Sequence, residues 1–365
     1  GTYVGQNQQI NKIRNCTNDS DNEYSRSWWN RPYRAIANAN LAIANIPTID
    51  EMEESAKNRC LGEAYALRAY NYFNLVRIFG AVPLILNPVD ASSEELYPSQ
   101  ASVEEVYNQI VSDLQAAENS GLPWDDASGR VTMGVVKSLL AQVYMTMAGY
   151  PLQRGNEYYQ LAASKSKEVI DNGTYSLFDS YDKLHDVAYE NQGEHMFMIQ
   201  YQAGVTANGW QYLYCPFNMD ISAYSTETGS IYALQEFIDS YEEGDKRTED
   251  HQFYYTSYTS NNDRSQVVTF PSHFIFKMFD VDAQENTAQS SLNWPLLRYA
   301  DVLLLYAEAA NEAEGAPSES AYNAVNQIRQ RANLQPLAGL SQNQFREAVW
   351  KERYHELAFE NKIWF

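Results

Sequence analysis

The feature that most constrains this fold is an apolar pattern with helical spacing, which dominates both ends of the chain and is missing from its middle. In the first part, the pattern recurs over residues 29–43, 66–76, 103–117, 136–147 and 159–169. Side chains three and four residues apart share one face of a helix, so each run predicts an amphipathic helix. Ser102 and Glu105 form a capping-box signature before the third run, and Gly80 and Gly173 stand where the second and fifth runs end.

A second helical region begins at Trp294 and carries two apolar stripes on different faces. A helix that is buried on two faces needs neighbours on both sides, as in a helical solenoid. Two further helices are predicted over residues 321–332 and 345–359. Alanine faces tyrosine and phenylalanine throughout, which is typical of tetratricopeptide-like helical pairs. We therefore expect a mainly α fold with a tetratricopeptide-like scaffold.

Between these regions lies a long insert without helical periodicity. Residues 194–201 predict a strand, and the rest is loop rich in Gly, Asn, Ser and aromatic residues. Long irregular segments cost ordering entropy and commonly carry function. The sequence thus predicts four segments: an N-terminal segment (1–25), the first part of the scaffold (26–172), an irregular ligand-binding insert with a few short strands (173–293) and the second part of the scaffold (294–365).

Charge and cysteine content exclude several classes of function. The 365 residues include 47 acidic and 26 basic side chains, for a net charge of −21, so the surface repels a phosphate backbone and no nucleic-acid partner is expected. Three scattered cysteines without a CxxC pair supply neither a disulfide framework nor a zinc site. No run approaches the ~18 consecutive apolar residues of a membrane span. The opening residues are polar, so an export signal or a lipid-bearing cysteine would lie upstream of them.

No catalytic motif is present. The sequence lacks GxGxxG, P-loop, HExxH and GxSxG patterns, and its five histidines have no spacing that a metal requires. His355 stands beside residues of an apolar stripe, which favours a structural role. The runs over 19–21 and 280–282 lack the Gly and the terminal Glu of a calcium loop, so a structural calcium ion has no support. We expect no enzyme activity and no cofactor.

Aromatic residues of the insert are the better lead. The chain has 28 Tyr and 7 Trp, and the insert gathers many of them in polar loops, including Phe217, Tyr224 and Phe253. Sugar rings stack on Trp or Tyr while their hydroxyls bind polar side chains at the rim. If residues 210–214 were extended, alternate rings would share one face. The candidates are Trp210, Tyr212, Tyr214, Tyr254, Tyr255 and Tyr258.

The alternative is that these rings pack the insert onto the scaffold. This packing alternative stays open for every ring. It has less weight at Tyr254, Tyr255 and Tyr258, because large rings in a polar run suit an exposed patch. A second group of candidates lies near the first helix. Trp28 points about 100° away from the apolar stripe that includes Trp29, so Trp28, Asn30 and Arg14 are predicted at the rim of a shared site.

Five separated pieces of the sequence resemble the SusD/RagB family. They are WNRPYRAIANANLAI from Trp29, GEAYALRAYNYFNLVRIFGAVPLI from Gly62, WPLLRYADVLLLYAEAANEAEG from Trp294, AYNAVNQIRQRANL from Ala321, and the closing KERYHELAFENKIWF. They occur in the family's order and span nearly the whole chain. Two departures stand out, since family members usually have Gly where this chain has Asn361 and continue beyond the position of Phe365. We therefore expect a chain that is truncated at both ends.

The resemblance implies a nutrient-binding lipoprotein on the extracellular face of the outer membrane of a Bacteroidetes-type bacterium, held there by an N-terminal lipid anchor. It implies glycan capture without catalysis, with a SusC-like TonB-dependent transporter as the partner that imports the glycan. Two alternatives remain: peptide binding for the same kind of transporter, or a tetratricopeptide-type scaffold for protein interaction.

Overall fold

The computed structural model describes residues 7–90 and 96–364 and is mainly α-helical with a few short strands, as the sequence predicts. The described residues fall into two compact units. The helical unit comprises Ser20–Tyr175, Asp301–Ala324 and Gly339–Phe365, and the insert unit comprises Gly1–Asp19, Ser176–Ala300 and Val325–Ala338. Among the described residues, no helix is both long enough and apolar enough to cross a bilayer.

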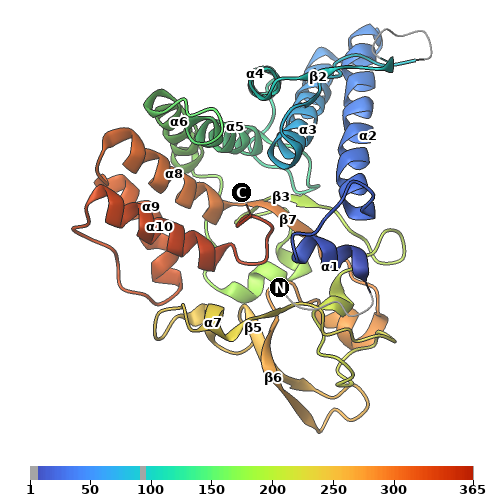
Figure 1. Cartoon of the computed structure of the whole chain (residues 1–365), viewed down its shortest axis with the longest axis vertical. Helices are drawn as coiled ribbons and strands as arrows, with labels where there is room; N and C mark the ends of the chain where they lie inside the picture. Colours follow the sequence, from blue (N-terminus) through green and yellow to red (C-terminus); the bar gives the residue numbers. More distant parts are fainter. Residues whose placement is uncertain (1–6, 91–95, 365) are drawn as a thin grey trace. The chain divides into compact units, whose positions relative to one another are not determined.

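The helical unit begins with five helices, of which each packs on the next (blue to green in Figure 1). They are α2 (Glu23–Asn45), α3 (Glu54–Phe79), α4 (Val103–Glu118), α5 (Met133–Ala148) and α6 (Asn156–Asn172). The predicted capping box opens α4, since the Ser102 hydroxyl accepts from the Glu105 amide and the Glu105 carboxylate accepts from the Ser102 amide. Left-handed Gly173 ends α6. Short strands β1 (Val82–Pro83) and β2 (Gln100–Ala101) pair after α3. These helices confirm the tetratricopeptide-like helical-pair scaffold.

Three more helices complete the C-terminal part: α8 (Tyr299–Glu314), α9 (Glu319–Arg331) and α10 (Gln342–Glu356). In the helical unit a buried charge cluster joins α8 to α10, because the Asp301 carboxylate forms ion pairs with Arg353 at 2.6 Å and with Lys362 at 3.0 Å. Gln142 of α5 donates to the same carboxylate at 2.9 Å. One acidic side chain thus connects three segments that are distant in sequence.

The insert unit contains two small antiparallel sheets. Strand β3 (His195–Ile199) pairs with β7 (Trp294–Arg298), and a three-stranded sheet has the order β4 (Tyr232–Ala233), β6 (Val267–Ile275), β5 (Tyr254–Thr259). The strand predicted over 194–201 is therefore confirmed as β3. Short helices α1 (Gln8–Arg14) and α7 (Gln235–Ile238) also belong to this unit.

Two local predictions are wrong, and one short helix was not predicted. The segment from Trp294 is strand β7 and the helix starts only at Tyr299, because pairing with β3 buries Leu297 and Arg298. The segment around Tyr255, expected as loop, is strand β5 in register with β6. Helix α1 was not predicted, and its start depends on a cap in which the Asn7 side chain accepts from the Ile10 amide.

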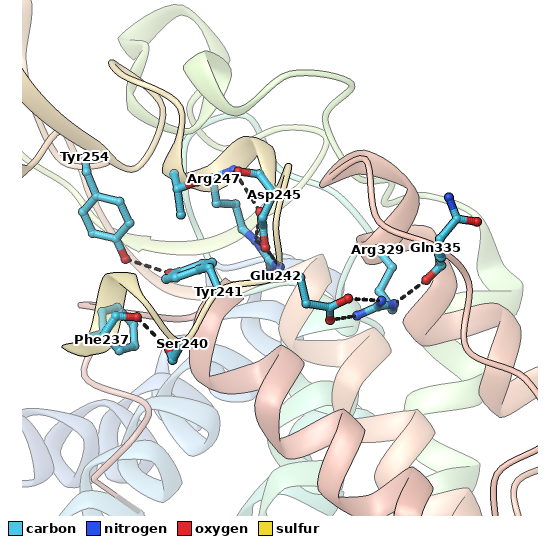
Figure 2. Close-up of polar contacts among 10 residues, drawn as sticks. Phe237, Ser240, Tyr241, Glu242, Asp245, Arg247, Tyr254, Arg329 and Gln335 are labelled. Atoms are coloured by element: carbon cyan, nitrogen blue, oxygen red, sulfur yellow. Dashed lines mark hydrogen bonds and ion pairs between the residues drawn. The ribbon is translucent and has the colours of Figure 1, made fainter. Parts of the chain in front are cut away.

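Charged pairs stabilise the insert unit from within. Fully buried Glu194 accepts from Arg298 of β7 and from Arg331 of α9. Figure 2 shows a second pairing, in which Nη1 and Nη2 of Arg329 donate to the Glu242 carboxylate, at 2.8 and 3.0 Å. These pairs join the end of α9 to segments that lie far earlier in the chain.

Candidate functional site

Four of the predicted site rings are buried, which corrects the expectation that they are exposed. Tyr214 is 3% exposed, Tyr254 1%, Tyr255 0% and Tyr258 9%. Strand β5 places Tyr255 and Tyr258 in an apolar cluster with Cys215, Ile221, Phe270, Phe274, Phe276 and Phe279. The Tyr254 hydroxyl lies 2.7 Å from the Tyr241 hydroxyl (Figure 2). These rings have no open face on which a sugar could stack.

Residues 210–214 are not extended, so the condition under which alternate rings would share one face is not met. Residues Gln211–Leu213 form a short 3₁₀ helix, η5, so the three rings of 210–214 do not share one face. Trp210 stays 49% exposed and Tyr212 is half-buried, whereas Tyr214 turns into the core.

The N-terminal candidates are exposed but lie in different units. Arg14 ends α1 in the insert unit, and its Nε donates to the Asn15 side chain at 3.3 Å. Trp28, 51% exposed, and Asn30 lie on α2 of the helical unit. The structure therefore brings Trp210 and Tyr212 together on one loop, while the membership of Trp28, Asn30 and Arg14 in the site stays a prediction.

The loop that carries the exposed rings spans residues 208–231, and we call it the aromatic loop. Besides Trp210 and Tyr212 it carries Phe217, which is 72% exposed, and half-buried Tyr224. The ring centroids of Tyr212 and Tyr224 are 6.4 Å apart, with the ring planes inclined by 51°. The two rings thus lie near each other, tilted rather than stacked, on the loop that also exposes Trp210 and Phe217.

Two buried glutamines hold the base of the aromatic loop. In the Gln211 side chain, Nε2 donates to the Met278 carbonyl at 2.8 Å and Oε1 accepts from the backbone amide of Asp280 at 2.9 Å. Gln284 donates to the Gln211 carbonyl at 3.0 Å, and its side-chain oxygen accepts from the Ser222 hydroxyl at 2.6 Å. Because each buried amide is satisfied on both sides, the loop is fixed on the segment 278–284.

Backbone bonds close the aromatic loop on itself. The Gly229 amide donates to the Cys215 carbonyl at 2.8 Å, and the Ile231 amide to the Leu213 carbonyl at 3.1 Å. Gly229 has a φ of +58°, and a Cβ there would lie 2.9 Å from the Phe217 amide nitrogen. Only glycine fits this crossing, which keeps exposed Phe217 close to the returning chain.

The buried tyrosines form the floor beneath this loop. The Tyr255 hydroxyl donates to the Tyr214 carbonyl at 2.8 Å, and the Tyr258 hydroxyl donates to Glu285 at 2.7 Å. Both rings pack edge-on or tilted against Phe279, with centroids at 5.2 and 5.0 Å. The rings that the sequence suggested as contact residues therefore support the exposed ones.

The electrostatic environment of the ring pair is acidic. Burial, with the nearby Asp280 charge, raises the pKa of the Tyr224 hydroxyl to about 12, so it stays protonated. Among the described residues this hydroxyl has no hydrogen-bond partner. Burial also raises the pKa of Glu190 to about 7, and Asp280 and Asp186 add to this shift.

Across residues 7–90 and 96–364, no group of three or more His, Cys, Asp or Glu side chains could hold a metal ion. The arrangement at the aromatic loop offers partly exposed ring faces and exposed polar groups, which suit reversible binding of a polar ligand.

Sequence reasoning noticed Phe217 and Tyr224 as aromatic residues of the insert but did not select them. It missed Glu227 altogether, whose carboxylate accepts three backbone amides of the loop. Exposure of a ring and capture of a carboxylate by the backbone both depend on tertiary contacts, and the only local signal is the density of aromatic and turn-forming residues.

Two models of known protein families match this chain. The SusD family model matches residues 193–365, and a model described as starch-binding and associating with the outer membrane matches residues 3–145. A SusD-like protein P2 of Formosa agariphila is 31% identical over 97% of this chain and 73% of its own length.

Solved structures agree with the sequence comparisons. A SusD superfamily protein from Parabacteroides distasonis superposes with a TM-score of 0.95 at 39% identity, covering 100% of this chain and 78% of its own. A laminarin-binding SusD-like protein superposes with a TM-score of 0.80 at 28% identity, covering 99% of this chain and 80% of its own. The relative from Formosa, the matching family model and these solved structures show that the chain belongs to the SusD family.

Proposed function

We propose that the protein captures glycans at the cell surface, without chemical turnover, for import by a SusC-like TonB-dependent transporter. The neighbouring rings of Tyr212 and Tyr224 carry this proposal, because half-buried aromatic rings at a surface suit the apolar faces of sugar rings. Exposed Trp210 on the same loop adds a further stacking surface. The laminarin-binding relative and the family's link with the outer membrane support carbohydrate as the ligand and the membrane surface as the location.

The anchor and the partner belong to the same proposal. We place the protein on the extracellular face of the outer membrane, held by a lipid at its N-terminus. In this proposal a lipid attached to the chain holds it at the membrane, in line with the outer-membrane association that the matching family model describes.

Isothermal titration calorimetry against soluble polysaccharides tests the binding step. The panel contains laminarin, xyloglucan, galactan, mannan and an anionic glycan, with a protein digest as a further sample. Saturable binding of one glycan, with the polymer recovered at unchanged length, is the expected result. Binding of the digest alone would replace glycan by peptide as the ligand, and shortening of the polymer would overturn the proposal that there is no turnover.

A further inference from the structure

The aromatic loop contains an anion-binding turn that is filled by the protein's own side chain. The Glu227 carboxylate accepts from the amides of Met219 at 2.5 Å, Asp220 at 2.8 Å and Ile221 at 2.6 Å. Asn218 and Asp220 have positive φ values of 54° and 56°, which turn these successive amides toward one point. Such a concave row of amides carries partial positive charge and binds anions.

The captured carboxylate closes the short stretch of chain that carries Tyr224. Residues 222–226 run from the turn to Glu227, so the bond from the Ile221 amide to Glu227 joins the two ends of this stretch. Inside it, the Tyr224 amide donates to the Ser222 hydroxyl at 3.1 Å. The position of the Tyr224 ring therefore depends on the carboxylate that closes the stretch.

Both sides of the closure are attached to fixed parts of the insert unit. On one side the Asp220 carboxylate accepts from the Ser260 hydroxyl at 3.0 Å, just after β5. On the other side the residue after Glu227, Thr228, donates its amide to the Tyr212 carbonyl at 3.4 Å. Glu227 thus lies between the backbone that carries Tyr212 and the turn that precedes Tyr224.

We propose that Glu227 is a positioning residue, which sets the geometry of the Tyr212 and Tyr224 ring pair by filling the amide turn at 219–221. It acts through the loop and does not itself contact the ligand. This inference rests on the proposed glycan-binding function of the ring pair. It differs from a role in stability alone, because it predicts that the binding surface changes while the rest of the insert unit stays folded.

The first test does not need a glycan. Hydrogen exchange is measured by NMR on the amides of residues 219–221 in the wild type, in Glu227→Ala and in Glu227→Gln. We expect exchange at least tenfold faster in Glu227→Ala and an intermediate rate in Glu227→Gln. Because an empty amide turn binds small carboxylates, 100 mM sodium acetate should slow exchange again in Glu227→Ala, and 100 mM sodium chloride should not. Unchanged exchange in Glu227→Ala, or no effect of acetate, overturns the inference.

The second test measures affinity for whichever polysaccharide of the panel binds the wild type. Glu227→Ala should lose at least tenfold in affinity, with partial recovery in acetate. The matched control is Asp250→Ala, which removes another carboxylate of the insert unit that accepts a backbone amide, that of Thr256 at 2.9 Å. This control should lose stability and keep its affinity.

The outcomes separate the two ideas. If the wild type binds a glycan and Glu227→Ala binds it equally well, the positioning role fails and the proposed function stands. If the wild type binds no glycan of the panel, the proposed function fails, and the exchange data still decide whether Glu227 closes the loop.

Discussion

The rings of Tyr212 and Tyr224 lie with their centroids 6.4 Å apart, although one belongs to the 3₁₀ helix η5 and the other to an irregular part of the aromatic loop. Both rings belong to a loop whose base is held by the buried side chains of Gln211 and Gln284. If sugar stacking on such rings dominates binding, single substitutions should produce large effects, because a few aromatic residues usually carry most of the binding energy.

We expect Tyr224→Ala and Trp210→Ala each to weaken glycan binding by about 1–3 kcal/mol, or roughly 5- to 150-fold. Tyr224→Phe keeps the ring and removes a buried hydroxyl that has no partner among the described residues, so its affinity should stay within about 0.5 kcal/mol of the wild type. Calorimetry with the bound polysaccharide measures all three. Tyr97→Ala removes a ring that is 90% exposed in the helical unit and serves as the control, which should bind like the wild type.

Substitution of the buried tyrosines should affect stability directly. Tyr255→Ala removes a fully buried ring and should cost about 3–5 kcal/mol of the free energy of unfolding. Tyr255→Phe leaves the Tyr214 carbonyl without its donor and should cost about 1–2 kcal/mol. Urea denaturation followed by tyrosine and tryptophan fluorescence gives both values. If Tyr255→Ala unfolded at the wild-type midpoint and lost only affinity, the ring would be a contact residue as first expected.

The helices could be predicted from the sequence because their signals are local. Spacing, the Ser102 capping box and Gly173 act within one or two turns, so α2 to α6 followed from neighbouring residues. The fold class followed as well, since alternating small and large residues in paired helices restrict the packing. The boundaries of the four predicted segments stay predictions.

The site was harder to predict because the exposure of a ring depends on distant partners. Tyr254 and Tyr255 stand in a run of polar residues, yet β5 pairs with β6 and buries them. A period-two alternation cannot reveal this when both faces of the strand carry tyrosine. The helix expected at Trp294 was wrong for the same reason, because its partner strand β3 lies almost a hundred residues earlier.

Glu194 should be the most sensitive charged residue of the insert unit. Although burial opposes its ionisation, the charges of Arg331 and Arg298 hold the pKa of Glu194 at about 2. Glu194→Gln leaves two arginines without their counter-charge, so we expect a loss of about 3–5 kcal/mol at pH 7. Glu236→Gln changes the net charge equally at an exposed position and should lie within about 0.5 kcal/mol of the wild type.

The pH dependence provides an independent check on Glu194. A carboxylate with a lowered pKa in the folded state contributes stability above its unfolded pKa, and this contribution is lost as the pH falls. Thermal unfolding between pH 5 and pH 2 should therefore show a steeper loss of stability in the wild type than in Glu194→Gln. Parallel curves for the two proteins would contradict the assigned ion pairs.

Glu190 should have the opposite effect on the pH dependence of stability, because its pKa is raised in the folded state. Burial raises it from 4.5 to about 7, and the charges of Asp280 and Asp186 add to the shift, although the Asn293 amide opposes it by donating to the carboxylate at 2.6 Å. The protonated form is favoured in the folded state. Its contribution to stability is therefore complete below about pH 4.5 and is lost as the pH rises through about 7.

Glu190→Gln removes this titration while keeping an oxygen that can accept from the Asn293 amide. The difference in melting temperature between Glu190→Gln and the wild type should thus shift in favour of the variant as the pH rises from 5 to 8. Exposed Glu243→Gln is the control and should keep a constant offset over the same range. A constant offset in Glu190→Gln as well would show that the carboxylate is ionised in the folded protein throughout, and that the acidic groups near the Tyr212 and Tyr224 ring pair do not disfavour its charge.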